Sequence, residues 1–290
     1  MLVRKNLLIV GKNSYIGRYF TEYAMKLGAD VVALSSKDCD FLKPRDVSSL
    51  FASLGSKSYT VIFLAVINKS VANSYQSFLQ NEEMVRNLIE GHKLANIESV
   101  IYFSSVDVYG KKPSLPITEE SKINPDDWYG LSKYACEQML LSIGELNCPV
   151  TVLRIPGVYG NAPNDRSVIG TIAACLLRND PVRLTDDGRV LRDYVFVDDL
   201  CRLLWALIPL KHRGVLNVAT GDSLPLAEIV RRVGAALRIE PHLVLTSDNS
   251  ERDFDLVFET SRLKSLLPDF RFSDFAVGAR SYLETKQGGS

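Results

Sequence analysis

The stretch that decides the fold runs from Asn6 to Gly17 and reads Asn-Leu-Leu-Ile-Val-Gly-Lys-Asn-Ser-Tyr-Ile-Gly. Its first half is a short apolar run that ends at Gly11, which is typical of a buried parallel strand. A helical stretch follows to about Leu27, and Gly28 is placed to end it. The segment therefore predicts a strand, a tight turn and a helix whose N-terminus can meet a dinucleotide pyrophosphate.

The turn itself carries the glycines that such a site needs. Gly11 permits the tight bend, and Gly17 lets the helix and the strand pack closely. The middle position, often a third glycine, is Ser14, whose side chain either crowds the diphosphate or donates a hydrogen bond to it. An ordinary βα turn has similar spacing, but the place of this turn at the start of a βαβ pattern favours cofactor binding. The predicted contacts are Gly11, Asn13, Ser14, Tyr15, Ile16 and Gly17.

Strands and helices alternate along the rest of the first half. Apolar runs predict strands at 31–34, 60–65, 99–103 and 149–155, with helices at 46–54, 75–95 and 128–146. This order predicts an α/β fold, a Rossmann-like doubly wound parallel sheet with right-handed crossovers. We expect residues 1–156 to form the dinucleotide-binding domain, with returning segments near 190–220.

After about Gly157 the rhythm loosens. Helical patterns at 168–177, 197–207 and 225–237 alternate with strand candidates at 182–184 and 216–219, and a last helix is predicted at 272–284. Residues 157–286 are therefore expected to form a smaller mixed α/β C-terminal portion that binds the substrate. The tail at 287–290 is expected to be disordered.

Composition excludes several classes of function. Lys+Arg and Asp+Glu are equal at 34 each, so the chain lacks the broad positive charge that nucleic acid or an anionic membrane requires. The apolar run at 7–10 is too short for a signal peptide, and no stretch approaches membrane-spanning length. The five cysteines and three histidines are scattered, which predicts reduced thiols, no metal site and a cytoplasmic protein.

Tyr129 and Lys133 are the candidate catalytic pair. They are four residues apart at the start of a predicted helix, so both project from one face. A neighbouring ammonium favours the phenolate, which lets a tyrosine exchange a proton with a substrate alcohol or carbonyl. The same lysine can hold the nicotinamide ribose. Ser105 follows the 99–103 strand, where its hydroxyl can bind the substrate oxygen. We therefore predict catalysis by Ser105, Tyr129 and Lys133.

The strings around this pair resemble the extended short-chain dehydrogenase/reductase family, also called the NAD-dependent epimerase/dehydratase family. Phe103-Ser104-Ser105-Val106-Asp107-Val108-Tyr109-Gly110 and Trp128-Tyr129-Gly130-Leu131-Ser132-Lys133 match the Ser-Ser-x-x-Val-Tyr-Gly and Tyr-Gly-x-Ser-Lys segments of that family. Further matching segments are Asp40-Phe41, Leu64-Ala65, Asn81, 153–160 and 192–199. The resemblance covers most of the chain and implies a cytoplasmic enzyme that acts on nucleotide-activated sugars.

The resemblance also implies roles for individual residues. It places Asp40 and Phe41 at the adenine, and Leu64, Ala65, Val66, Ile155 and Val158 along the cofactor. Arg192 matches an arginine that binds the diphosphate of a nucleotide sugar, unless it pairs with the acids of its own segment. Gly157 stands where many of these enzymes carry an asparagine that contacts the substrate.

The residue ending the second strand usually separates NAD from NADP, because an acid there bonds the ribose 2′-OH. Here the strand runs into Ser35, Ser36 and Lys37, whose hydroxyls and cation suit a 2′-phosphate and favour NADP. Asp38 follows at once and leaves NAD as the alternative.

The function predicted is a 4-keto-(6-deoxy)sugar-nucleotide reductase. Sugar-nucleotide dehydratases of the family use a Thr-Asp-Glu-like string where this chain has Ser105-Val106-Asp107, so elimination is disfavoured, although Asp107 can still contact the substrate. The alternative is a C4-epimerase with tightly bound NAD. A dinucleotide-binding sensor or scaffold without catalysis is the alternative from another class. Family members often dimerise through two helices, so a homodimer using the 75–95 and 128–146 helices is expected.

Overall fold

The computed structural model describes residues 5–143, 148–160, 167–247 and 254–287. By its internal contacts the chain divides into two compact units. The first unit comprises Met1–Gly110, Ile123–Arg154 and Leu203–Leu216, and the second comprises Lys111–Lys122, Ile155–Arg202 and Asn217–Ser290. The chain therefore leaves the first unit and returns to it twice.

The first unit is built on a six-stranded sheet with the order β10-β5-β4-β3-β1-β2. Its strands are β1 (Asn6–Val10), β2 (Asp30–Leu34), β3 (Ser58–Phe63), β4 (Asn96–Ser105), β5 (Val150–Ile155) and β10 (Gly214–Asn217). β1 pairs in parallel with both β2 and β3, and β3 pairs in parallel with β4. Strand order reverses between β1 and β3, and in open sheets ligands bind beyond the carboxyl ends of the strands at such a point.

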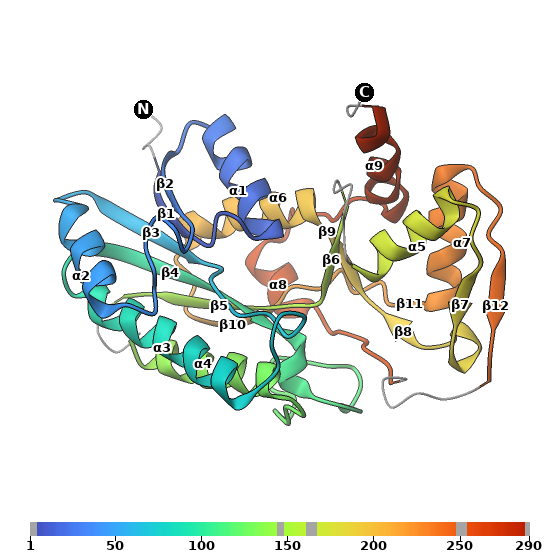
Figure 1. The fold of residues 1–290 in the computed structure, drawn as a ribbon, viewed down its shortest axis with the longest axis horizontal. Helices are drawn as coiled ribbons and strands as arrows, with labels where there is room; N and C mark the ends of the chain where they lie inside the picture. Colours follow the sequence, from blue (N-terminus) through green and yellow to red (C-terminus); the bar gives the residue numbers. More distant parts are fainter. Residues whose placement is uncertain (1–4, 144–147, 161–166, 248–253, 288–290) are drawn as a thin grey trace. The chain divides into compact units, whose positions relative to one another are not determined.

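Helices cover both faces of this sheet. α2 (Pro44–Ser53), α3 (Tyr75–His92) and α4 (Trp128–Ile143) lie on one face, and α1 (Tyr15–Lys26) lies on the other (Figure 1). Side chains of α1 and of α6 (Val197–Leu207) meet where the rings of Tyr23 and Trp205 stand edge to face. The predicted α/β class with a Rossmann-like doubly wound sheet is confirmed.

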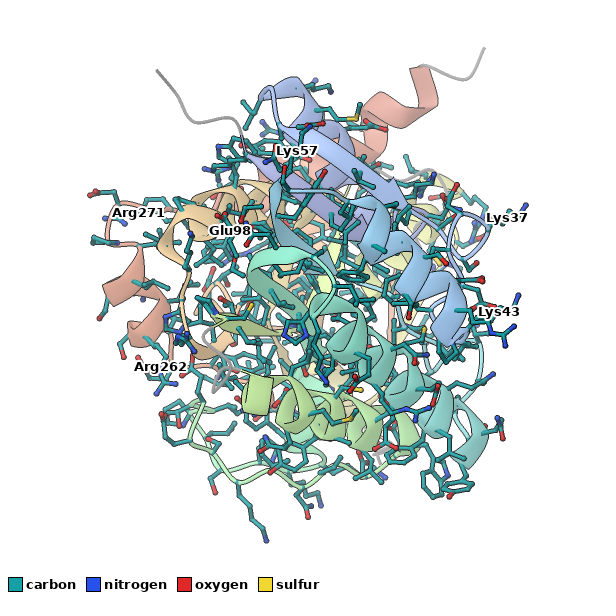
Figure 2. The ribbon with its side chains drawn as sticks, turned by 90° about the vertical axis from the view of Figure 1, so that its left-hand side faces the viewer. Lys37, Lys43, Lys57, Glu98, Arg262 and Arg271 are labelled. Carbon is teal, nitrogen blue, oxygen red and sulfur yellow. The ribbon has the colours of Figure 1, made fainter. Side chains whose placement is uncertain are left out.

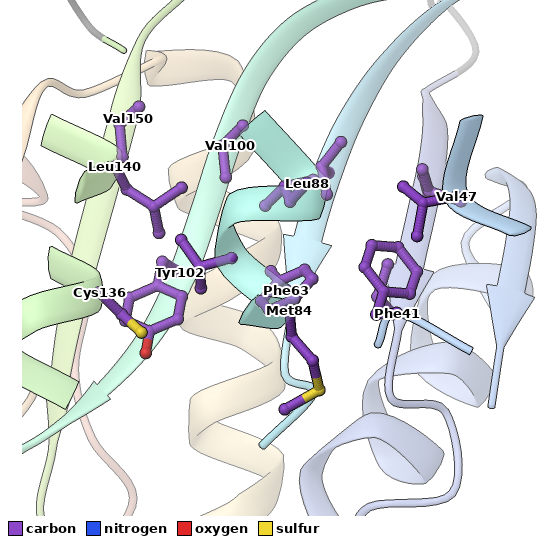
Figure 3. Packing of buried hydrophobic residues seen from close by; sticks show 14 of the residues in the cluster. Phe41, Val47, Phe63, Met84, Leu88, Val100, Tyr102, Cys136, Leu140 and Val150 are labelled. Atoms are coloured by element: carbon purple, nitrogen blue, oxygen red, sulfur yellow. The ribbon is translucent and has the colours of Figure 1, made fainter. Parts of the chain in front are cut away.

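The core between the sheet and its three-helix face is aromatic at its centre (Figure 3). Phe63 of β3 meets Phe41 edge to face and stacks on Tyr102 of β4, with ring centroids 5.4 and 6.3 Å apart. Met84 and Leu88 of α3 close the cluster from the helix side. Burying each such side chain contributes about 1.5–3 kcal/mol, so this cluster holds the carboxyl ends of β3 and β4 in place.

The second unit contains three two-stranded sheets. β6 (Gly157–Tyr159) pairs in parallel with β9 (Tyr194–Phe196), β7 (Val182–Leu184) in parallel with β12 (Leu243–Leu245), and β8 (Leu191–Arg192) antiparallel with β11 (Leu224–Pro225). Its helices are α5 (Val168–Leu177), α7 (Leu226–Leu237), α8 (Ser261–Leu266) and α9 (Phe275–Gln287). This is the predicted smaller mixed α/β portion.

Several predicted bounds shift. The strand predicted at 216–219 is β10 at Gly214–Asn217, which joins the Rossmann sheet as its edge strand. The helix predicted at 46–54 begins earlier, because Pro44 has the fixed φ suited to a first helical turn. The tail predicted over 287–290 starts at the last residue of α9, and 288–290 lie outside the described residues. Within the described residues, every helix is too short or too polar to cross a membrane.

Candidate active site

The glycine turn after β1 has the geometry of a phosphate-binding loop. Gly11 has a φ of +102°, and a Cβ there would lie 3.0 Å from the Ala65 backbone nitrogen. A Cβ on Gly17 would lie 2.2 Å from the Gly11 carbonyl oxygen, so α1 approaches the turn as only glycine allows. Ser14 is the N-cap of α1, and its hydroxyl accepts a hydrogen bond from the Gly17 N–H at 3.1 Å. The Ser14 side chain is therefore engaged in starting the helix.

The turn after β2 is organised around Asp38. Its carboxylate accepts hydrogen bonds from the Ser35 N–H and hydroxyl at 2.8 and 2.6 Å, and pairs with the Lys12 ammonium at 2.9 Å. These partners, Ser35 first, hold the pKa of Asp38 well below its usual value. Lys37 is exposed and points outward (Figure 2). Asp38 thus structures the loop, and Lys12 and Lys37 place two cations at the end of β2.

Sequence reasoning placed Asp40 and Phe41 at the adenine, and the structure gives them different surroundings. The Phe41 ring is 3% exposed in the core, and the Phe41 carbonyl accepts a hydrogen bond from Asn87 at 2.8 Å. Asp40 is partly exposed, and its carboxylate accepts from the Leu42 N–H. The Phe41 ring is therefore packed in the core and Asp40 is partly exposed, and their contact with the adenine stays a prediction.

The loop after β3 is fixed to α4 by Asn81. Its side-chain oxygen accepts from the Ile67 N–H at 2.7 Å, and its amide donates to the Ile67 carbonyl and to the Ser132 hydroxyl. Leu64 is buried, and Ala65 and Val66 are partly exposed beside Gly11. These hydrogen bonds of Asn81 hold the backbone after β3, which is predicted to contact the cofactor, against α4.

The predicted catalytic residues meet in the first unit. Ser105 ends β4 and its hydroxyl caps a short 3-10 helix, Val106–Tyr109. A Cβ on Gly130 would lie 2.7 Å from the Asp107 carbonyl oxygen, so the start of α4 approaches that 3-10 helix through a glycine. This close approach brings the Tyr129 phenol within hydrogen-bonding reach of Ser105.

Lys133 is buried close to Tyr129. The side chain is 3% exposed, and its ammonium donates to the Phe103 carbonyl at 2.6 Å, with 5.7 Å to the centroid of the Tyr129 ring. Burial lowers the pKa of Lys133 to about 8. Burial also raises the pKa of Tyr129 well above its usual value, with Asp107 and Asp127 adding to the effect. In this geometry Tyr129 is a protonated phenol at neutral pH.

Two polar residues that sequence reasoning missed also contact this cluster. Lys69, from the loop after β3, pairs with the Asp107 carboxylate at 2.8 Å. Asn73 accepts a hydrogen bond from the Tyr129 N–H at 3.1 Å. Both residues follow the strand predicted at 60–65, but neither lies in a segment that resembles the family. Their position in the loop after that strand is the only feature of the sequence that could have pointed to them.

A buried ion pair supports the cluster from behind. Arg154 binds both carboxylate oxygens of Glu137 at 2.7 and 3.1 Å, and donates to the Tyr109 hydroxyl at 3.0 Å. Ser104 donates to the same carboxylate. Glu137 lies one helical turn beyond Lys133, and Ser104 precedes Ser105, so the network links the end of β4 to α4.

In the second unit, Gly157 is explained by packing. A Cβ at Gly157 would lie 2.4 Å from the Tyr194 ring, which fills the space that an asparagine side chain would need. Ile155 is buried, and Val158, in β6, is partly exposed. Position 157 therefore carries glycine and not the asparagine common in the family, because the Tyr194 ring occupies the space beside it.

Arg192 lies at the wall of a cavity of about 760 Å³ in the second unit. Its guanidinium donates to the Leu191 and Phe254 carbonyls and stacks on the Phe254 ring at 5.4 Å. The neighbouring acids are held elsewhere: Asp193 accepts from Thr220 and Gly221, and Asp199 accepts from Ser273. Aromatic residues of this wall include Tyr159, Tyr194, Phe196, Phe270, Phe272 and Phe275.

Comparison with known proteins identifies the family. A family model described as "NAD dependent epimerase/dehydratase family" matches residues 7–219. The chain belongs to this family. The predicted family and enzyme class, an NAD(P)-dependent short-chain dehydrogenase/reductase, are thereby confirmed.

Relatives within the family carry both epimerase and reductase names. A putative UDP-glucose 4-epimerase of Methanocaldococcus jannaschii is 24% identical over 77% of this chain and 79% of its own length. A UDP-2-acetamido-2,6-beta-L-arabino-hexul-4-ose reductase of Pseudomonas aeruginosa is 26% identical over 68% of this chain and 47% of its own. Among solved structures, RMD from Pseudomonas aeruginosa complexed with NADPH has a TM-score of 0.82 at 22% identity, covering 97% of this chain and 99% of that chain.

Proposed function

We propose that this protein is an NAD(P)-dependent reductase of a 4-keto-(6-deoxy)sugar nucleotide, with Ser105, Tyr129 and Lys133 as its catalytic residues. The observation that carries the proposal is the close approach of the start of α4 to the 3-10 helix after β4, which sets Tyr129 near Ser105, with Lys133 buried in the same helix. Gly11 and Gly17 let the turn after β1 pack closely against the loop after β3 and the start of α1, because a side chain at either would collide with backbone. This tight turn is what a dinucleotide-binding βα unit requires. The residues present thus fit a nicotinamide cofactor.

The chemistry follows from what each residue can hold or give. A bound nicotinamide dinucleotide supplies the hydride that forms the new C–H bond. On substrate binding, Ser105 turns its single hydroxyl proton from Asp107 Oδ2 to the keto oxygen. Tyr129 gives its phenolic proton to that oxygen as the C=O double bond becomes a C–O single bond. Lys133 holds the nicotinamide ribose and places a cation beside the phenolate that remains. The raised pKa of Tyr129 keeps the phenol protonated, which is the state a reductase needs.

We assign NADP as the preferred cofactor. Asp38 already accepts from Ser35 and pairs with Lys12, so its carboxylate is committed within the turn. Ser36, Lys37 and Lys12 remain around the place where a 2′-phosphate would bind, and two cations there suit a phosphate better than a hydroxyl. When a 2′-phosphate binds, the Lys12 ammonium can move from Asp38 to the phosphate, so that the charge of Lys12 is paired before and after binding.

Arg192 is the residue we assign to the diphosphate of the nucleotide sugar. Its guanidinium is already ordered by two carbonyls and an aromatic ring, which lowers the conformational entropy lost on binding a ligand. A cavity of about 760 Å³ has the size of a small-molecule site and is lined by aromatic rings that can contact a base.

A nucleotide-sugar C4-epimerase with tightly bound NAD is the second candidate, because curated relatives with that name match most of the chain. An epimerase oxidises and re-reduces one carbon, so Tyr129 must accept a proton before it donates one. The reductase requires only the donation, and because a phenol is protonated at neutral pH in either case, the substrate panel below separates the two. We also expect a homodimer through α3 and α4, where Tyr75 and Trp128 are 57% and 41% exposed; light scattering of the purified protein tests this.

The deciding experiment supplies NADPH and NADH separately with a panel of 4-keto-6-deoxy sugar nucleotides. Stoichiometric cofactor oxidation supports the reductase, whereas interconversion of UDP-sugars without net oxidation supports the epimerase. Tyr129→Phe should abolish turnover, and Tyr134→Phe, a matched loss of one hydroxyl on the same helix, should not. Unchanged turnover in Tyr129→Phe would sink the catalytic assignment, and binding of a dinucleotide without turnover of any sugar nucleotide would favour the dinucleotide-binding scaffold alternative.

A further inference from the structure

Lys69 occupies a position in this cluster that the catalytic scheme above leaves unused. Its ammonium lies 2.8 Å from Asp107 Oδ2, and the same oxygen accepts the Ser105 hydroxyl at 3.0 Å. The ammonium is also 5.7 Å from the centroid of the Tyr129 ring. One lysine is therefore connected to two of the three proposed catalytic residues through a single carboxylate.

The charges around Tyr129 show why a second cation matters. Asp107 faces it from the 3-10 helix, Asp127 from the segment before α4, and Lys133 from α4 itself. The Tyr102 hydroxyl, on β4, is the remaining titratable group close by.

The two cations near the phenol are not equivalent. The ammonium of Lys133 is turned to the Phe103 carbonyl, whereas Lys69 is paired directly with Asp107. Lys69 is therefore the cation that pairs with Asp107, the carboxylate that faces the Tyr129 phenol.

We propose that Lys69 is a positioning residue of this active site, a cation that fixes Asp107 against Ser105 and offsets the charge of Asp107 beside Tyr129. The proposal deepens the function proposed above and rests on it for its catalytic meaning. Lys69 is 45% exposed and Asp107 30% exposed, so substrate can reach the pair. With Lys69 in place, the carboxylate is held where it accepts the Ser105 hydroxyl before substrate binds, and Lys69 offsets its charge at the phenol.

The proposal makes a prediction about the ionisation of Tyr129. A unit charge about 6 Å away changes a pKa by about one unit at an effective dielectric constant between those of protein and water. Removing Lys69 leaves Asp107 uncompensated, so the phenolate becomes harder to form. Without Asp107 the lysine loses the partner that holds it near the ring, so removing the carboxylate takes both charges away and leaves the ionisation of Tyr129 near its parent value.

The test replaces Tyr129 with a difluorotyrosine, a more acidic phenol whose ¹⁹F chemical shift reports its ionisation without any turnover. The midpoint is measured in the parent protein and in Lys69→Met, Asp107→Asn, the double variant and Lys69→Arg. Lys57→Met is the matched control, because Lys57 forms a similar half-exposed pair with Asp30, at 2.6 Å, in the same unit. Circular dichroism verifies that each variant is folded.

Lys69→Met should raise the midpoint by about one pH unit, and Asp107→Asn should leave it near the parent value, because the lysine is released together with the carboxylate. Lys69→Arg should restore the parent value, and Lys69→Met should have little effect when Asp107 is already Asn. The proposal is overturned if Lys69→Met shifts the midpoint no more than Lys57→Met, or equally with and without Asp107. Because the titration needs no substrate, it can succeed even if no keto-sugar is turned over, which separates its failure from failure of the proposed function.

Discussion

Lys133 offers a prediction in which activity and stability change in opposite directions. Its ammonium is buried at 3% exposure, and burial lowers its pKa from 10.5 to about 8. Between these pH values the unfolded chain keeps a proton that the folded protein releases, so stability rises with pH across this window. Below pH 8 both states are protonated, and the folded state carries the full penalty of about 3 kcal/mol that this difference represents.

Lys133→Met should therefore be inactive yet more stable at pH 7. Loss of the hydrogen bond to the Phe103 carbonyl costs about 1 kcal/mol, which leaves a net gain of about 1–2 kcal/mol. The gain over the parent should decline between pH 8 and pH 10.5, because the parent loses its penalty there. Urea unfolding of the cofactor-free proteins, followed by circular dichroism at pH 7, 8, 9 and 10, measures this difference.

Lys26→Met, at the exposed end of α1, is the control and should show a difference near zero at every pH. A stability difference for Lys133→Met that stays constant from pH 7 to pH 10 would refute the reasoning. It would mean that the ammonium is hydrated, or that its bond to the carbonyl compensates for burial in full.

Three further predictions follow from single contacts. Glu137→Gln should destabilise the protein by about 3–5 kcal/mol in urea unfolding, because it leaves a buried Arg154 guanidinium without its counter-charge, and Glu137→Leu with Arg154→Met should recover most of that loss. Gly157→Asn should lower the melting temperature through collision with Tyr194, and adding Tyr194→Ala should restore it. Lys12→Met should weaken NADPH binding about tenfold in a fluorescence titration while leaving NADH binding unchanged.

Local patterns predicted the elements that local forces determine. The run at Asn6–Val10 and the helix at Val168–Leu177 have the predicted bounds, since an apolar run or a helical period is written in adjacent residues. α8, at Ser261–Leu266, escaped prediction because six residues are too few to show a period. Ser105 and Tyr129 were predicted to act together, and the close approach of α4 to the 3-10 helix after β4 sets them near each other.

What the sequence left open depends on contacts between distant segments. Ser14 was placed at the diphosphate, and the structure adds that its hydroxyl accepts from the Gly17 N–H as the cap of α1, which leaves its proton to donate. Phe41 matched a family string, but Phe63 and Asn87 determine where its ring and carbonyl point. Lys69 carries no motif at all, because its partner Asp107 lies 38 residues further along the chain. Side-chain partners across a sheet cannot be read from spacing alone.

The surroundings of Asp107 bear on the type of reaction as well as on its rate. Elimination of water needs one group to donate a proton and a second to accept one at a neighbouring carbon. Asp107 occupies the position of the second acid in the Thr-Asp-Glu-like string of dehydratases. One of its oxygens already accepts from Ser105 and from Lys69. The preceding position, where dehydratases of the family carry an acid, is the buried Val106. Because Oδ2 of Asp107 is engaged by Ser105 and Lys69, and position 106 is apolar, the site is suited to exchanging one proton at Tyr129 alongside one hydride.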